Sequence, residues 1–229
     1  MAYKGDLIVY YSDQRDPAHG QKLVSTPHSL SSPPPPVVES NPQTQVHQVT
    51  SDLLTYGPVV NDVAYSTYSW RPGMTTIASL PFGQYILTYE FYGAEEADFA
   101  VYYRITTDPL NFNASTGVVL RATDGSVPVS SPYVVWTPVG GPLGTIVVSC
   151  GTTSDIYLNH GLGAPGAWTK VETPEGASYS RSLRVLKDQR EILVVGGGVL
   201  GGEANAVTAS VVDVEPKAPG FASCGAEKR

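Results

Sequence analysis

One glutamate in the sequence stands in a setting that could support acid chemistry. Glu90 is flanked by Tyr89, Phe91 and Tyr92, and it falls at the end of an apolar run that predicts a strand. An aromatic, poorly solvated environment raises the pKa of a carboxyl group and keeps it protonated, as a general acid requires. From the residues alone, a solvated carboxylate at a strand end is the more ordinary interpretation.

Several other kinds of chemistry find no support in the sequence. The histidines lack metal-ligand spacing and neither cysteine has a CxxC partner, so we expect no metal and no cofactor. The net charge of -7 comes from scattered residues rather than runs. Nucleic acids and anionic membranes favour clustered basic surfaces, so we expect neither as a partner. The chain has no apolar run long enough to cross a bilayer, and its first residues do not resemble a signal peptide.

The elements that must position Glu90 are short strands in a repeated pattern. A turn followed by an apolar run recurs at 5–12, 83–91, 144–151 and 190–197, and each run precedes a second strand-like segment. Preceding strands are predicted at 71–81, 131–141 and 179–188. Turns near Asp52, Asp108 and Gly163 each precede an aromatic plug, respectively Tyr56, Phe112 and Trp168. The pattern, without helical segments, predicts an all-β propeller with about four blades over 1–214, and a flexible tail over 215–229.

Two irregularities interrupt the repeat. The first unit has no preceding strand, so we expect the chain to start inside a blade. Residues 24–45, which include four consecutive prolines, are predicted to be a disordered insert. Without residues 24–45, the spacing between the first and second units comes close to the spacing between the second and third. This segment could be a translated intron, because a Val codon begins with GT and a Gln codon can be CAG, or it could be an ordinary proline-rich surface insertion.

Motifs along most of the chain resemble those of glycoside hydrolase family 93. The similarity runs from Tyr3 to about Val214 and is broken only by the proline-rich segment. It is carried by the strings YYSDQRD (10–16), RPGM (71–74), YEFYG (89–93), SPYVVWTP (131–138), GTIVVSCGT (144–152) and YSRSL (179–183). The resemblance implies a six-bladed, sialidase-like propeller that acts on α-1,5-linked arabinan of plant cell walls. It also implies exo-acting release of short arabinose units with retention of configuration.

Retaining hydrolysis requires two carboxyl groups about 5–5.5 Å apart. Glu90 matches one of the two catalytic glutamates of the family, and we favour the acid/base role for it. The resemblance places the second on a strand that would precede Met1, and Glu95, Glu96, Glu172 and Glu175 are expected on solvated loops. We therefore expect this chain to be inactive by itself.

Further site residues follow from the same resemblance. Tyr179 matches a tyrosine of the family's active site, with core packing as the alternative. Arg181 lies two residues on in a predicted strand, so both should face the channel. Arg71, Tyr92, Asp13 and Arg15 are candidates for binding sugar hydroxyls, although ion pairs between loops explain Asp13, Arg15 and Asp16 equally well. Trp136 is either a platform for stacking sugar or a core residue.

Two alternative functions remain at this stage. A sialidase would need an arginine triad and clear Asp-box turns, which are degenerate here. A sugar-binding propeller remnant without activity fits the missing carboxylate. We expect a monomer, and an extracellular location for the full-length family protein, although this chain shows no signal peptide.

Overall fold

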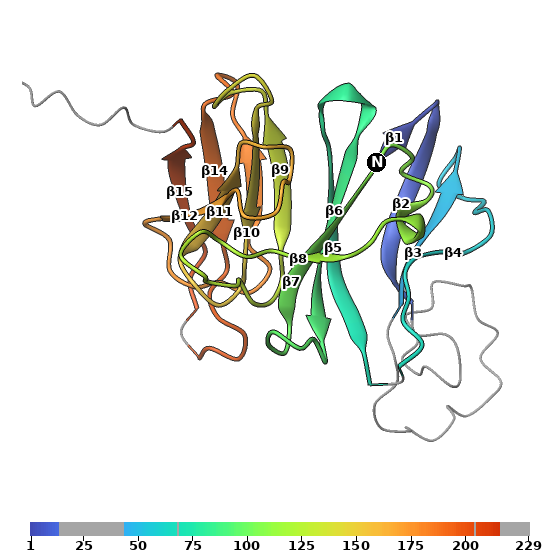
Figure 1. The fold of residues 1–229 in the computed structure, drawn as a ribbon, viewed down its shortest axis with the longest axis horizontal. Coiled ribbons are helices and arrows are strands. Elements are labelled where there is room, and N and C mark those ends of the chain that lie inside the picture. Colours follow the sequence, from blue (N-terminus) through green and yellow to red (C-terminus); the bar gives the residue numbers. More distant parts are fainter. Residues whose placement is uncertain (14–43, 68, 204, 216–229) are drawn as a thin grey trace, which may run out of the picture.

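The computed structural model describes residues 1–13, 44–67, 69–203 and 205–215 of the 229-residue chain. These residues form strands, turns and two short 3-10 helices, η2 (Pro81–Gly83) and η3 (Phe112–Ala114). Neither helix is long enough to span a membrane. The all-β fold predicted from the repeat is therefore confirmed (Figure 1).

The strands form four antiparallel sheets that follow one another along the chain. The first sheet contains β1 (Ala2–Tyr3), β2 (Asp6–Asp13), β3 (Thr44–Thr50) and β4 (Val60–Val63). The second contains β5 (Arg71–Ser79), β6 (Tyr85–Tyr92), β7 (Ala100–Thr106) and β8 (Val118–Val119). The third contains β9 (Tyr133–Thr137), β10 (Thr145–Ser149), β11 (Asp155–Asn159) and β12 (Trp168–Glu172). The fourth contains β13 (Ser182–Val185), β14 (Glu191–Gly196) and β15 (Thr208–Asp213).

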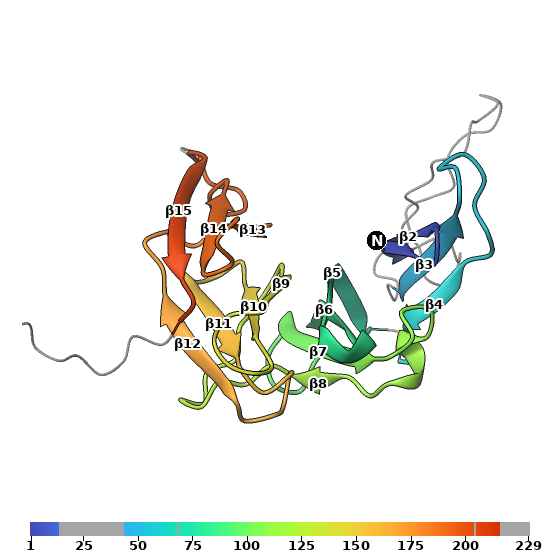
Figure 2. The same ribbon diagram turned by 90° about the horizontal axis from the view of Figure 1, so that it is seen from above.

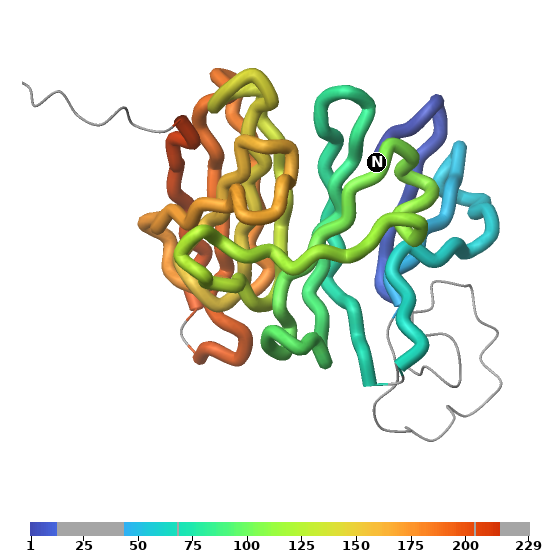
Figure 3. Tube along the Cα trace, viewed as in Figure 1, coloured from blue at the N-terminus to red at the C-terminus, as the bar shows by residue number. Residues whose placement is uncertain are grey.

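The sheets stand side by side in an arc, as blades of a propeller do. Figure 2 shows β2, β5, β9 and β13 on the inside of the arc, and β4, β8, β12 and β15 on the outside. Neighbouring inner strands contact each other, β2 with β5, β5 with β9, and β9 with β13. The chain trace in Figure 3 passes through the sheets in sequence order. About four blades are thus present, as predicted.

Strand β6 explains how adjacent blades are joined. Its sequence YILTYEFY is almost entirely buried, and successive side chains of a strand point to opposite faces. Leu87, Tyr89 and Phe91 join a cluster with Val63 of the first sheet. Ile86, on the other face, joins the cluster shared with the third sheet. A strand buried on both faces is rich in apolar residues, and in β6 only Thr88 and Glu90 interrupt the apolar and aromatic residues.

Three predictions about the ends of elements are wrong in detail. The first blade does have a strand before β2, because β1 pairs with it through Ala2 and Tyr3. The predicted disordered insert 24–45 includes Thr44 and Gln45, which belong to β3, while 24–43 lie outside the described residues. Glu215, assigned to the flexible tail, forms an ion pair with Arg190 at 2.8 Å, and 216–229 lie outside the described residues.

The predicted aromatic plugs divide into two that are buried and one that is not. Phe112 and Trp168 are fully buried, and the Trp168 ring meets the Tyr103 ring edge-on, with centroids 5.5 Å apart. Tyr56 is 44% exposed, so that prediction is wrong. Its blade is instead anchored by a buried polar pair, His47 Nδ1 and the Asp62 carboxylate, 3.0 Å apart.

Candidate active site

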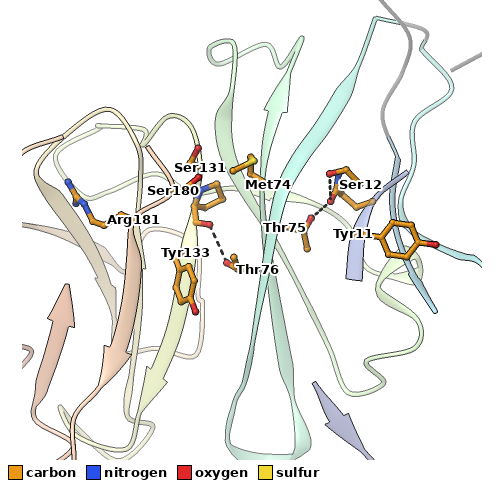
Figure 4. A pocket seen from close by; sticks show the side chains of 11 residues that line it. Tyr11, Ser12, Met74, Thr75, Thr76, Ser131, Tyr133, Ser180 and Arg181 are labelled. Carbon is orange, nitrogen blue, oxygen red and sulfur yellow. Dashed lines mark hydrogen bonds between the residues drawn. The ribbon is translucent and has the colours of Figure 1, made fainter. Parts of the chain in front are cut away.

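A cavity of about 340 Å³ lies where the inner strands of the four sheets converge (Figure 4). Every sheet, or the segment leading into it, contributes to its wall. The lining residues are Tyr11, Ser12, Gln45, Met74, Thr75, Thr76, Ser131, Pro132, Tyr133, Ser180 and Arg181. Converging strands from several blades are the usual way in which a propeller builds a ligand site.

Three of the residues that line this cavity have a strained backbone. Met74, Ser131 and Ser180 have left-handed φ values of 51°, 43° and 56°. Met74 lies within β5, whereas Ser131 and Ser180 each lie two residues before an inner strand, β9 and β13. The β5–β6 register shifts between Gly73 and Thr76, which marks a bulge. Such conformations are costly for residues other than glycine, and they cluster at functional sites.

The Glu90 carboxyl group is fixed at the edge of the cavity. Its Oε2 accepts the backbone N–H of Ser131 at 2.8 Å and the hydroxyl of Ser130 at 3.2 Å. Glu90 is only 9% exposed. Because Ser131 lines the cavity, the carboxyl group is one residue removed from the wall, and the left-handed Ser130–Ser131 pair connects them.

Burial raises the pKa of Glu90 above its ordinary value of 4.5, while the donors Ser131 and Ser130 and the charge of Arg71 oppose the shift. A raised pKa was predicted, with Tyr89, Phe91 and Tyr92 as its source, and of these three only Tyr92 lies on the same face of β6 as Glu90. Tyr89 and Phe91 pack on the opposite face of β6, against the first sheet. On the face of β6 that carries Glu90, the segment leading into the third sheet contacts the carboxyl group through Ser130 and Ser131.

Arg71 and Tyr92 lie beside Glu90. They are directly opposite each other in the β5–β6 ladder, and Arg71 Cζ is 5.7 Å from the centroid of the Tyr92 ring. Paired residues share a face of the sheet, as do residues two apart in one strand. Arg71 and Tyr92 therefore lie on the same face as Glu90. Neither residue lines the cavity itself.

The predictions for Tyr179 and Arg181 have different outcomes. The Tyr179 hydroxyl lies 3.7 Å from Met74 Sδ, so it reaches the wall of the cavity. Arg181 is fully buried, and its guanidinium donates to the carbonyls of Thr153, Ser154, Asp155 and Gly176. It contributes to the wall, but in Figure 4 the guanidinium points away from the cavity. The shared-face prediction is wrong because the left-handed Ser180 breaks the extended backbone it assumed.

The remaining predicted residues lie elsewhere or cannot be placed. Trp136 packs against the core cluster, and its indole N–H donates to the Leu143 carbonyl at 3.2 Å. It does not line the cavity, so the prediction of a stacking platform there is wrong. Asp13 ends β2, opposite Thr44. Arg15 lies outside the described residues, as does Asp16.

The acidic loop residues show one further departure from the sequence analysis. Glu95, Glu96 and Glu172 are exposed, as expected, although Glu172 ends strand β12 and does not lie on a loop. Glu175 is only 6% exposed, and its Oε2 has no hydrogen-bond partner. Among the residues that the structure describes, no three His, Cys, Asp or Glu side chains are grouped so that they could hold a metal ion.

The polar wall formed by Ser12, Gln45 and Thr75 was not predicted from the sequence. Gln45 had been assigned to the proline-rich insert, although it lies directly opposite Ser12 in the β2–β3 ladder. The available signal was the alternation TQVHQVT, which continues the strand pattern back to Thr44. Thr75 is brought to the wall by the bulge in β5, which the sequence pattern does not reveal.

Known structures resemble this chain over most of its length. An α-L-arabinanase of Penicillium chrysogenum complexed with arabinobiose shares 45% identity, with a TM-score of 0.79 over 93% of this chain and 56% of that chain. The GH93 α-L-arabinofuranosidase of Fusarium graminearum with arabinobiose shares 42% identity, with a TM-score of 0.80 and the same coverages. A sialidase of Trypanosoma rangeli shares 9% identity, with a TM-score of 0.50 over 92% of this chain and 36% of that chain. No protein-family model and no curated protein matches the sequence.

The likeness to the sialidase, at that low identity, concerns the fold alone, and it defines the class as a sialidase-like β-propeller. Within that class the chain is a relative of glycoside hydrolase family 93, at 41–45% identity. The predicted resemblance is thus confirmed. The chain spans 56% of the length of these structures.

Proposed function

We propose that the cavity is the sugar-binding site of an arabinan-degrading glycosidase and that Glu90 is its general acid/base. One observation carries the proposal: a buried carboxyl group is fixed by Ser130 and Ser131 at a cavity that all four blades line. The likeness to structures solved with arabinobiose supports this substrate class. A plant cell-wall polysaccharide as substrate agrees with an extracellular site of action. We also propose that the protein acts as a monomer.

The proposed reaction is hydrolysis with retention, releasing short arabinose units from a chain end. In the first step Glu90 donates its proton to the glycosidic oxygen as the carbon–oxygen bond breaks, and a second carboxylate attacks the sugar carbon. In the second step Glu90 removes a proton from the water that releases the sugar. The raised pKa of Glu90 suits this role, because the group must be protonated when the leaving oxygen departs.

The second carboxylate is not provided by the cavity wall described above. None of the eleven lining residues is acidic. We propose that it comes from the part of the family structure that this chain does not span. The 229-residue chain is therefore expected to bind arabinobiose without hydrolysing arabinan.

Two measurements on the purified chain test this proposal. Calorimetric titration with α-1,5-arabinobiose should give saturable binding, whereas a sialoside should not bind. Incubation with linear arabinan, followed by chromatography, should give no arabinobiose. Preference for the sialoside would favour a sialidase, and release of arabinobiose by this chain would overturn the prediction of inactivity.

A version of the chain extended by its upstream coding sequence separates an enzyme from a sugar-binding remnant. It should release arabinobiose, and Glu90→Gln should lower turnover by about 10²–10⁴-fold, the usual contribution of a general acid. Glu95→Gln is the matched control, because Glu95 is exposed, and it should leave turnover unchanged. Binding without turnover in the extended protein would instead support a non-catalytic sugar-binding role.

A further inference from the structure

Gln45 is a buried amide at the junction of the first two blades. It is only 1% exposed and lines the cavity. Its Nε2 donates to the Pro72 carbonyl at 2.7 Å and to Ser12 Oγ at 3.0 Å. Its Oε1 accepts the hydroxyl of Thr75 at 2.5 Å. Ser12 and Thr75, on the two sides of this amide, also line the cavity (Figure 4).

The orientation of the Gln45 amide follows from the Pro72 carbonyl. A carbonyl oxygen can only accept hydrogen bonds, so the amide nitrogen must face it. The amide oxygen must then face Thr75. Because the backbone fixes Pro72, the side chain of Gln45 has a single orientation in which all three of these contacts are satisfied.

This orientation determines what the two hydroxyl groups can offer to a ligand. Thr75 uses its hydrogen on Gln45 Oε1, so its oxygen is left as an acceptor. Ser12 accepts a hydrogen from Nε2. Its own hydrogen is held only by a long 3.4 Å contact to Oε1, and can turn to a ligand in the cavity. The wall therefore presents an acceptor at Thr75 and a donor at Ser12.

We propose that Ser12 and Thr75 bind hydroxyl groups of an arabinofuranose unit and that Gln45 is the residue that positions them. This inference rests on the proposed function. A sugar hydroxyl both donates and accepts, so it matches a wall with one acceptor and one donor. The bulge in β5 that brings Thr75 to Gln45 also places Met74 on the wall, to which Pro132 contributes as well. These apolar groups suit the CH surface of a furanose ring.

Substitutions in the full chain test the inference by titration with α-1,5-arabinobiose. Thr75→Val removes the hydroxyl with little change of shape, and it should weaken binding about 2- to 10-fold, as expected for one hydrogen bond. Ser12→Ala should have an effect in the same range. Thr75→Ser keeps the hydroxyl and should bind like the unaltered chain. Thr208→Val is the matched control on the exposed strand β15, and it should have no effect.

Arabinobiose analogues that each lack one hydroxyl group distinguish direct contact from a structural role. An analogue without the hydroxyl that contacts Thr75 should bind Thr75→Val and the unaltered chain equally well. A merely structural role would weaken the binding of every analogue to the same extent. Gln45→Met should weaken the binding of arabinobiose at least as much as either hydroxyl substitution, because both hydroxyls lose their orientation.

The outcomes separate this inference from the proposed function. If the unaltered chain does not bind arabinobiose, the proposed function fails and this inference fails with it. If the chain binds arabinobiose and correctly folded Thr75→Val and Ser12→Ala variants bind within twofold of it, the inference is overturned while the proposed function stands. Circular dichroism and thermal unfolding verify the fold of each variant.

Discussion

Glu90 and Arg181 are two buried charged residues near the same cavity, and they differ in how far other groups satisfy them. All four hydrogen bonds of the Arg181 guanidinium go to backbone carbonyls. The Glu90 carboxyl receives both of its donors on Oε2. From the part of the chain that the structure describes, Oε1 accepts no hydrogen bond. Glu90 therefore keeps a free acceptor, whereas both terminal nitrogens of Arg181 are engaged and, among the described residues, only its buried Nε lacks a partner.

The difference separates a residue that can act on a ligand from one that holds the fold together. The carbonyls bound by Arg181 belong to the β10–β11 turn and to the segment between β12 and β13. Arg181 thus fastens the third blade to the start of the fourth. Burial lowers its pKa, and the nearby Cys150, Glu175 and Asp155 act in the opposite direction. Without Arg181 the four carbonyl groups would lose the donors that it provides. This residue is therefore expected to matter chiefly for stability.

The largest effect is therefore expected from Arg181→Ala. Loss of this buried guanidinium leaves four carbonyl groups without its donors, and it should lower the free energy of unfolding by about 3–5 kcal/mol. Urea denaturation followed by tryptophan fluorescence measures the change. Arg184→Ala is the matched control, because Arg184 is exposed on β13, and its effect should stay within about 0.5 kcal/mol.

A different result for Arg181 would reverse its assignment. If Arg181→Ala kept the stability of the unaltered chain but abolished arabinobiose binding, the guanidinium would be a sugar ligand, as the sequence analysis had predicted. The contrast with Glu90 would then disappear.

Much of the fold could be predicted because it depends on local patterns. Short apolar runs separated by turns predicted the central strands of every blade, and the strands β6 and β10 lie within the predicted runs 83–91 and 144–151 except for Tyr92. Strand ends were less predictable. The turn at Tyr179–Ser180 shortened the predicted strand 179–188 to β13, since a left-handed serine leaves no mark in hydrophobic periodicity.

The site was predictable only where one residue carried the signal. Glu90 was identified because it matches a catalytic glutamate of the family that the chain resembles, whereas the residues alone favoured a solvated carboxylate at a strand end. Gln45 was missed because the adjacent prolines dominated the composition of its neighbourhood. Its importance depends on contacts with Pro72 and Thr75, which are distant in sequence and meet it only through the packing of two blades.

The pH dependence of stability tests whether the Glu90 carboxyl group is desolvated in the folded chain. Because its pKa is raised on folding, the folded chain keeps a proton above pH 4.5 that the unfolded chain has released. The free energy of unfolding must then fall as the pH rises from 4.5 through the folded pKa. Glu90→Gln removes this loss, so the variant should gain stability relative to the unaltered chain as the pH rises toward 7.

Urea denaturation at several pH values measures that difference. The pKa of Asp62 is also raised. Its effect on the free energy of unfolding is the same in Glu90→Gln and in the unaltered chain, so it cancels in the difference between them. Glu95→Gln, at an exposed position, should give a difference that does not change with pH. A constant difference for Glu90→Gln as well would show that the carboxyl group is not desolvated in the folded chain.

The smallest effect is expected from Ser130→Ala, which removes one of the two donors to Glu90 and keeps the Ser131 N–H. The Ser130 hydroxyl favours the ionised carboxylate, so its loss should raise the pKa of Glu90 further. Titration of the Glu90 carboxyl carbon by NMR measures the shift, with Ser182→Ala on the exposed edge of β13 as control. An unchanged pKa would mean that the hydroxyl turns instead to Ser131 Oγ, 3.2 Å away. The backbone N–H of Ser131 would then be the single group that holds this carboxyl in place.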